Sequence, residues 1–424
     1  PIGAAAKPRA PRLSTVIDMR LAREESESMR AALARKGRGA ATAFDELLMA
    51  DRDWREARAQ VDNLRSRTKP KGPPTPQELE MLTRVREELK AAESDLALLE
   101  ERRDELLARV PNPPHHTAPD GATEEDAVEI KRVGNVPDFP FTPRDHLELG
   151  SFEMERAARL SGSRFAYRVG DTALLELAMY RYALDQLIIE GFEPMLPPVL
   201  VRQEAMYGTG FLPTDESNLY QIESDQLYLT GTSEVALAGY HMGEILEPGD
   251  LPLRYAGYST CFRREAGAAG KDTRGVIRVH QFDKVEMFVF TRPSESEAEH
   301  ERILAIEENL VRSLGIPYRV VNTAAGDLGP SAAKKYDIEA WIPSQGRYRE
   351  ITSCSNTTDY QARRLKVRVR ADGGTIHPHT LNGTAMTARW MIAVLENFQD
   401  EGGRVAIPEA LVRHGAPKSI GVDR

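Results

Sequence analysis

The sequence predicts an α+β protein in which an antiparallel helical hairpin precedes a larger domain built on an antiparallel sheet. Two segments near the amino terminus carry apolar residues at alternating spacings of three and four, the pattern of paired helices. A proline-rich segment separates them, and prolines at that density end a helix. Beyond residue 143, short runs rich in Val, Ile, Tyr and Phe alternate with helical stretches and glycine-rich turns, which is typical of a sheet with helices packed on it.

The two apolar series define the expected hairpin. Each helix should have about 25 to 30 residues, so at ~1.5 Å per residue the hairpin would project roughly 40 Å. One polar residue, Arg103, interrupts the second series. The first series is Leu47, Ala50, Trp54, Ala57, Val61 and Leu64, and the second is Leu82, Val85, Leu89, Ala92, Leu96, Leu99 and Leu106.

The expected tip of the hairpin is basic. It contains Arg65, Arg67, Lys69 and Lys71 and no acidic residue before Glu78. These charges fit either a solvated turn or an arm that contacts phosphate groups. The length of the hairpin favours the arm, because a protruding hairpin buries little core and needs another reason to exist.

The overall composition excludes several classes of protein. The chain has 424 residues, a net charge of −9 and no apolar run of the roughly 18 to 20 residues that a membrane helix needs. The negative charge argues against a protein that coats nucleic acid over its whole surface, although a local basic patch remains compatible with it. The two cysteines, Cys261 and Cys354, are far apart and favour a reducing, cytoplasmic compartment.

Changes in composition along the chain predict four regions. Residues 1–16, rich in Ala, Pro and basic side chains, are expected to be a disordered extension, and residues 17–112 the helical arm. Residues 113–143 contain six prolines and are expected to be a linker. Residues 144–424 form the α+β domain, and the sequence has neither a Gly-x-Gly-x-x-Gly nor a Gly-Lys-Ser/Thr phosphate loop.

The segment 258–290 is the densest candidate for chemistry. It is expected to form a strand, a cationic Gly/Ala-rich loop that begins at Arg263, and one or two further strands, including 276–282 and 285–290. Arginine's planar fork matches carboxylate or phosphate oxygens. Glu286 is the only charge in the second of those strands, so it should face a cavity or pair with a cation. An exposed charged hairpin with a structural ion pair would also account for these residues.

Two further clusters could bind an anionic ligand. The run 349–356 is rich in oxygen donors of the kind that Mg²⁺ prefers, but a regular strand sends Glu350 and Ser353 to opposite faces. Joint ligation would therefore require a bulge. A helix is expected over 385–399, and its Arg389 has alanines at i±4, which leaves room for an anion. Serine-rich strand ends and core-packed arginines are the plainer explanations.

Several runs of the sequence together resemble the seryl-tRNA synthetases. They occur in that family's order, and the likeness extends from about residue 17 to residue 412, including the hairpin and residues 17–23 before it. The runs are 230–234 (TGTSE), 262–267 (FRREAG), 278–287 (RVHQFDKVEM), 350–364 (EITSCSNTTDYQARR) and 380–384 (TLNGT).

The resemblance implies a class II aminoacyl-tRNA synthetase of the bacterial type, with a catalytic domain formed by an antiparallel sheet and flanking helices. It implies a cytoplasmic homodimer, with residues 191–198 matching the first class II motif at the dimer interface. L-Serine and ATP would react, with Mg²⁺, to seryl-adenylate, and the seryl group would pass to the 3′-terminal adenosine of tRNA(Ser). The arm would bind the tRNA.

The resemblance also implies a role for each matching side chain. The catalytic residues would be Arg263, Glu286 and Arg389. Serine would be bound by Thr232, Glu234, Arg263, Glu286 and Thr384, the last two reading its hydroxyl group. ATP would be bound by Arg263, Glu265, Phe282, Glu350, Ser353 and Arg389, with Glu350 and Ser353 as Mg²⁺ ligands, and tRNA by Arg65, Arg67, Lys69 and Lys71.

Three alternatives share this fold. An amino acid ligase that charges a carrier protein would keep the catalytic domain, but such relatives lack the arm. A binding module without activity would be expected to have lost some of Arg263, Glu265, Glu286, Glu350 and Arg389. A duplicated, antibiotic-resistant seryl-tRNA synthetase cannot be distinguished from a housekeeping enzyme on these residues.

Overall fold

A computed structural model describes residues 17–69, 75–266 and 274–421 of the chain. It divides into two compact units, residues 1–113 and residues 114–424. The predicted extension 1–16 and Lys71 of the predicted tip lie outside the described residues. Within the described part, no helix combines the length and the apolar character that crossing a membrane requires.

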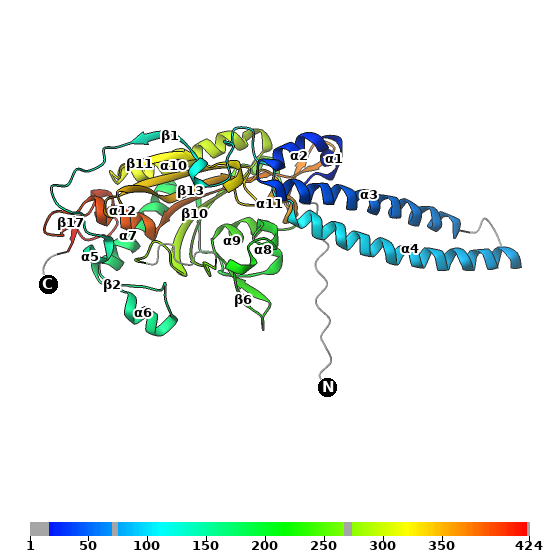
Figure 1. Ribbon diagram of the computed structural model, residues 1–424, viewed down its shortest axis with the longest axis horizontal. Helices are drawn as coiled ribbons and strands as arrows, with labels where there is room; N and C mark the ends of the chain where they lie inside the picture. The colour runs from blue at the N-terminus through cyan, green and yellow to red at the C-terminus, as the bar shows by residue number, and fades with distance from the viewer. Residues whose placement is uncertain (1–16, 70–74, 267–273, 422–424) are drawn as a thin grey trace. The chain divides into compact units, whose positions relative to one another are not determined.

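The first unit contains the predicted hairpin. After α1 (Met19–Glu24) and α2 (Ser26–Ala34), the long helices α3 (Arg38–Arg67) and α4 (Pro76–Arg109) pack side by side (Figure 1). The 30 residues of α3 agree with the expected length, and α4 is longer, with 34. Thr75 explains where α4 begins: its hydroxyl caps the backbone N–H of Glu78 at 3.3 Å, while the Glu78 carboxylate accepts from the Thr75 N–H at 2.7 Å. Pro76 is tolerated because the first helical residue needs no N–H partner.

Arg103, the polar residue that interrupts the second apolar series, has a partner on the other long helix. Arg103 lies 3.3 Å from the carboxylate of Asp51, which is only 1% exposed. Arg23 and Arg55 contact the other carboxylate oxygen of Asp51 at 3.0 Å. The guanidinium of Arg103 also lies 4.2 Å from the ring centre of Trp54, a favourable cation–π geometry. A buried charge cluster thus joins α3 and α4 at one fixed position.

The second unit is built on an eight-stranded sheet. All neighbouring strands are antiparallel except β4 and β9, which are parallel. The antiparallel sheet predicted from the sequence is therefore confirmed. In spatial order the strands are β1 (Val128–Val133), β11 (Tyr318–Asn322), β12 (Lys334–Ile342), β13 (Arg347–Asn356), β16 (His379–Thr387), β10 (Gln281–Thr291), β9 (Leu253–Phe262) and β4 (Glu193–Met195).

Helices and small sheets surround this sheet. The main core joins apolar side chains of α7 (Asp171–Ile189), α10 (Ser296–Ser313) and α12 (Ala388–Asn397) to the sheet. The other helices are α5 (His146–Leu149), α6 (Met154–Ser161), α8 (Gln203–Thr209), α9 (Glu234–Gly239), α11 (Tyr360–Arg364) and α13 (Glu409–Val412). The small sheets comprise β2 (Phe152–Glu153), β3 (Tyr167–Arg168), β5 (Leu200–Arg202), β6 (Tyr220–Ile222), β7 (Leu227–Leu229), β8 (Ile245–Leu246), β14 (Arg368–Ala371), β15 (Gly374–Ile376), β17 (Val405–Ala406) and β18 (Ser419–Ile420).

Strand β10 separates two apolar clusters. Val285, Met287 and Val289 join the main core, whereas Phe288 and Phe290 pack with α9 and α11 on the other face. Successive side chains of a strand alternate between faces. Glu286 therefore shares the face of the two phenylalanines, just before that cluster begins.

The predicted linker 113–143 differs from the expectation. It belongs to the second unit, and its residues Val128–Val133 form β1, which pairs with β11 at the edge of the sheet. The prolines flank this stretch rather than interrupt it, so its backbone is free to pair. Val128 and Ile130 are both 51% exposed, so the strand has no buried face to reveal it in the sequence.

Two predicted elements also have different bounds. The strand expected over 276–282 is irregular as far as His280, and β10 begins only at Gln281. The helix expected over 385–399 begins at Ala388, because the preceding residues extend β16. Thr387, whose hydroxyl accepts from the Arg389 N–H at 3.3 Å, caps the helix.

Candidate active site

A cavity of about 530 Å³ lies in the second unit, over the face of the sheet that carries Glu286. It contains every residue for which the sequence predicted a role in serine, ATP or Mg²⁺ binding. These come from six separate parts of the chain and are Thr232, Glu234, Arg263, Glu265, Phe282, Glu286, Glu350, Ser353, Thr384 and Arg389. The structure thus brings the ten side chains together, while their individual roles remain predictions.

A buried polar cluster occupies one end of the cavity. Glu286 is 2% exposed, and its Oε2 accepts from the Thr384 hydroxyl at 3.3 Å. The two residues face each other across β10 and β16, where a bulge in the register lies between Val285 and Glu286. Lys284, one pleat before Glu286 on the same face, places its ammonium 2.5 Å from the same Oε2 and donates to the Thr232 hydroxyl at 2.6 Å. Glu286 therefore both faces a cavity and pairs with a cation, the two outcomes expected of a lone charge in this strand.

Glu234 lies beside this cluster, at the start of α9. Gln361 and Asn382 donate amide N–H groups to its Oε1 at 2.7 and 2.9 Å. Both amides bind the same oxygen, and the Glu234 side chain lines the cavity. Burial, and after it the negative charge of Glu286, raise the pKa of Glu234 to about 7. Its charge state therefore changes near neutral pH.

Lys284, Gln361 and Asn382 were missed as site residues. Lys284 could have been found, because it lies two residues before Glu286 and side chains at that spacing share a face of a strand. Gln361 lies on α11 and Asn382 on β16, and only the tertiary fold brings them to Glu234.

Aromatic and charged groups line the middle of the cavity. The guanidinium of Arg263 lies 5.2 Å from the ring centre of Phe282, and its Nε donates to the Gly231 carbonyl at 3.0 Å. Glu265 has a φ of +52°, an uncommon backbone conformation for a residue with a side chain. Its carboxylate accepts from Arg278 at 2.6 Å. The predicted adenine contact of Glu265 thus comes with a cationic neighbour that the sequence did not single out.

Strand β13, which carries the oxygen donors, contains the bulge that joint binding of Mg²⁺ by Glu350 and Ser353 requires. In the pairing of β12 with β13, Ile338 faces Thr352 while Glu339 faces Glu350, so Ile351 is the extra residue. One extra residue reverses the alternation of side chains beyond it. Glu350 and Ser353, which a regular strand would separate, therefore both line the cavity.

Cations surround Glu350. Arg389, in the first turn of α12, places Nη1 3.5 Å from Glu350 Oε1 and donates its Nε–H to the Ile277 carbonyl at 3.4 Å. Desolvation within the cavity would by itself raise the pKa of Glu350, but the charges of Lys335 and Arg389 outweigh that effect and lower it. Glu350 is therefore ionised at neutral pH. Among the described residues, no three His, Cys, Asp or Glu side chains form a group that could hold a metal ion by themselves.

The basic residues of the predicted tRNA contact lie at the end of α3 in the first unit. Arg65, Arg67 and Lys69 are all exposed. Arg65 pairs with Glu93 of α4 at 2.9 Å, which offsets part of its charge. Arg67 and Lys69 are therefore the stronger candidates for a phosphate contact.

Comparison with known proteins places both units in one family. Residues 16–114 match the family described as seryl-tRNA synthetase N-terminal domain, and residues 218–398 match the tRNA synthetase class II core domain of the G, H, P, S and T enzymes. The serine–tRNA ligase of Thermobifida fusca is 49% identical over 409 residues, which cover 93% of this chain and 96% of that protein. The enzyme of Acidothermus cellulolyticus is also 49% identical, with 93% and 97% covered.

Solved structures agree with the sequence comparisons. The seryl-tRNA synthetase of Pyrococcus horikoshii, complexed with ATP, superposes with a TM-score of 0.91 at 40% identity and covers 96% of this chain and 100% of its own. The cytoplasmic serine–tRNA ligase of Naegleria fowleri, in complex with AMP, gives 0.85 at 33% identity, with 96% and 99% covered. The chain therefore belongs to the seryl-tRNA synthetase family, and so to the class II aminoacyl-tRNA synthetases.

Proposed function

We propose that this chain activates L-serine with ATP and transfers the seryl group to the 3′-terminal adenosine of tRNA(Ser). The observation that carries the proposal is the buried Glu286–Thr384 pair at the end of a cavity whose other walls carry Arg263 and Arg389. A small amino acid with a hydroxyl group suits the end that carries Glu286 and Thr384. A polyphosphate suits the walls that carry Arg263 and Arg389.

In the first step, a carboxylate oxygen of serine attacks the α-phosphorus of ATP, and the bond to the departing pyrophosphate breaks. Arg263 would bridge the α-phosphate and the serine carboxylate, and Arg389 would hold the γ-phosphate. Phe282 would stack on the adenine ring, and Glu265 would accept from its amino group. The catalytic contribution of these residues is positioning and charge neutralisation at the reacting phosphate.

Serine would be selected at the buried end of the cavity. Thr232 and Glu234 would hold its ammonium group, while Glu286 and Thr384 bind its hydroxyl group. Alanine would leave the buried acceptor Glu286 without that hydrogen bond, and a site built for a hydroxyl group rejects such an analogue strongly. The Lys284 ammonium, 2.5 Å from Glu286 Oε2, would hold that side chain in place until the substrate arrives.

The donor set around Glu350 fits Mg²⁺. This ion is usually held by one or two carboxylates together with substrate phosphates, so Glu350 and Ser353 on one face of the bulged strand suffice as protein ligands. When bound, Mg²⁺ neutralises phosphate charge. Glu350 also orients Arg389 through their 3.5 Å contact.

In the second step, the 3′-hydroxyl group of the terminal adenosine attacks the seryl carbonyl, and AMP leaves. The arm would bind the long variable stem of tRNA(Ser) through Arg65, Arg67, Lys69 and Lys71. Serine codons fall into unrelated groups, so recognition through a stem rather than the anticodon suits this amino acid.

The protein is further proposed to be a cytoplasmic homodimer. Apolar side chains are exposed in and near the segment 191–198. Ile189, at the end of α7, is 77% exposed, and Leu196, directly after β4, is 83% exposed. Leu174, Leu177 and Ile188 of α7 are at least 48% exposed. An apolar surface of this kind is expected to be covered by a partner.

The decisive test is ATP–pyrophosphate exchange with each amino acid in turn, followed by aminoacylation of total tRNA. Exchange should depend on serine alone, and serine should be loaded onto tRNA. Serine-dependent exchange without transfer to any tRNA, but with transfer to a carrier protein, would favour the carrier-protein ligase instead. Absence of exchange with serine would refute the proposal.

A further inference from the structure

Strand β10 is preceded by a return segment, residues 274–278, that forms part of the cavity wall. Val276, Ile277 and Arg278 line the cavity, although the segment has no regular secondary structure. Its position must therefore be fixed by side chains from elsewhere in the fold. Val276 packs in the main core, and four residues of the segment make polar contacts with other side chains.

Three of these contacts are weak or are shared with the substrates. Arg274 pairs with Asp145 at 2.7 Å, but its side chain is 70% exposed. Ile277 accepts from Arg389, and Arg278 pairs with Glu265. ATP would engage Arg389 and Glu265 itself, so these two contacts compete with nucleotide binding.

The fourth contact is buried and independent of the substrates. The backbone N–H of Val276 donates to Nε2 of His146 at 3.2 Å, and His146 is 4% exposed. The other ring nitrogen, Nδ1, lies 3.1 Å from Oε1 of Glu396, which is fully buried. Because Nε2 accepts, Nδ1 carries the proton and donates it to the carboxylate.

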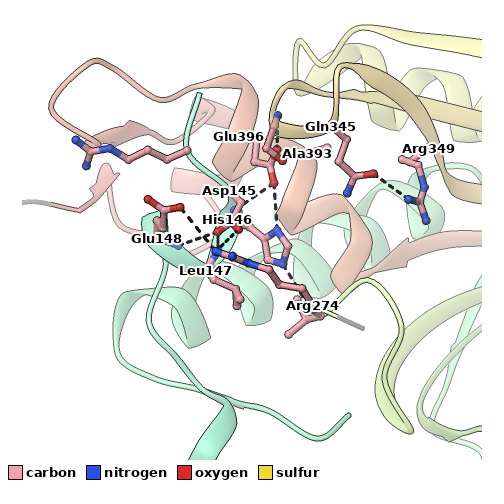
Figure 2. A network of polar contacts seen from close by, with 12 residues as sticks. Asp145, His146, Leu147, Glu148, Arg274, Gln345, Arg349, Ala393 and Glu396 are labelled. Atoms are coloured by element: carbon pink, nitrogen blue, oxygen red, sulfur yellow. Dashed lines mark hydrogen bonds and ion pairs between the residues drawn. The ribbon is translucent and has the colours of Figure 1, made fainter. Parts of the chain in front are cut away.

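Glu396 is itself held in place. Its Oε1 also accepts from the backbone N–H of His146 at 3.1 Å, and its Oε2 accepts from the backbone N–H of Ser344 at 3.0 Å. Figure 2 shows the imidazole between Glu396 on α12 and the segment that starts at Arg274. A Cβ at Gly275, where φ is +81°, would fall 2.2 Å from Nε2, so glycine lets the backbone lie directly on the ring.

Helix α12 carries both Glu396, which holds His146, and Arg389, which lines the cavity. Arg389 lies in its first turn and Glu396 lies two turns later, at a spacing of seven residues that returns to the same side of a helix. His146 therefore connects the helix that carries Arg389 to the return segment, and both form part of the cavity wall. Apart from the contact of Arg389 with Ile277, which ATP would engage, this imidazole is the buried polar link between these two parts of the cavity wall.

We infer that His146 is a positioning residue for the nucleotide: it holds the return segment 274–278 at a fixed distance from α12, and with it the two walls that enclose ATP. The inference rests on the proposed function, because it concerns the ATP half of the same cavity. It predicts an effect on ATP and little effect on serine, whose binding cluster makes no contact with His146 among the described residues.

Two conservative variants separate the two halves of the link. In His146→Gln the amide reaches the place of Nε2, and its oxygen can accept from Val276. In His146→Asn the amide reaches only the place of Nδ1 and can donate to Glu396. We expect His146→Asn and His146→Ala to raise KM for ATP in serine-dependent exchange about tenfold, the effect of one lost hydrogen bond in a buried site. His146→Gln should stay within about threefold, and KM for serine should change less than about twofold in all three.

A matched control is His300→Gln. His300 is also buried and donates from Nε2 to the Cys354 carbonyl at 3.1 Å, but it lies on α10 and does not line the cavity. Its variant should lower Tm without changing either KM. Equal KM values for ATP in the Asn and Gln variants, or an unchanged KM in both, would overturn the inference, even if His146→Ala fails to fold. Absence of serine-dependent exchange in the parent protein would instead refute the proposed function.

Discussion

If Glu234 binds the serine ammonium group, as proposed, serine binding should depend on pH. Its pKa is raised to about 7, so the folded protein holds a neutral carboxyl group below that pH and a carboxylate above it. Only the carboxylate can pair with the serine ammonium group. With a pKa of about 7, roughly 9% of Glu234 is ionised at pH 6 and roughly 91% at pH 8, so KM for serine should be about tenfold higher at pH 6.

The assay is serine-dependent ATP–pyrophosphate exchange between pH 6 and pH 8.5, at saturating ATP and Mg²⁺. Free serine keeps its ammonium and carboxylate groups over most of this range, so the protein is the principal titrating partner. Glu234→Gln serves as the control, because its amide preserves the shape but cannot ionise; it should show a high KM that is independent of pH. A flat profile in the parent protein, or a profile that persists in Glu234→Gln, would refute the reasoning.

Three further predictions concern other parts of the molecule. Glu286→Gln should raise KM for serine about tenfold or more and leave KM for ATP unchanged, because a charge-assisted hydrogen bond is lost. Glu286→Ala should in addition lower the free energy of unfolding by about 3–5 kcal/mol, since the ammonium of Lys284 loses its carboxylate. Unchanged affinity for serine in both would contradict this role. The double variant Arg67→Glu/Lys69→Glu should raise KM for tRNA about tenfold and spare pyrophosphate exchange, whereas Arg84→Glu, in an arm residue already paired with Glu80, should do neither. Ile189→Arg together with Leu196→Arg should yield a monomer in light scattering, and a persistent dimer would refute an interface at α7 and β4.

Local patterns predicted most of the fold. The apolar series at spacings of three and four predicts α3 and α4, because each helix must bury one continuous stripe. Likewise, the β-branched and aromatic run at 285–290 predicts the middle of β10. The exposed edge strand β1 has no such pattern, and the irregular segment after Arg274 contains Val and Ile although it forms no strand. In both places tertiary contacts, which no short window contains, decide the conformation.

The candidate site was predictable residue by residue, but not its supporting contacts. Matching motifs named ten of the residues that line the cavity. Gln361 and Asn382 escaped because only the tertiary fold brings them to Glu234, whereas the spacing of Lys284 to Glu286 could have indicated it. The bulge at Ile351 could be inferred only as a requirement of the ligand hypothesis. His146 was invisible for the same reason, since its partners lie 130 and 250 residues away along the chain.

The charge cluster around Asp51 determines how the two long helices of the arm align. If α3 and α4 slid past each other by one heptad, their apolar stripes could still match, but the buried Asp51 carboxylate would lose Arg103, its partner on α4, and keep only Arg23 and Arg55. The cluster thus favours a single register of the two helices. From Asp51 to Arg67, the last residue of α3, the helix then spans a constant length of about 24 Å at ~1.5 Å per residue. A tRNA bound to the basic end of α3 would therefore meet those charges at one set distance from the Asp51 cluster.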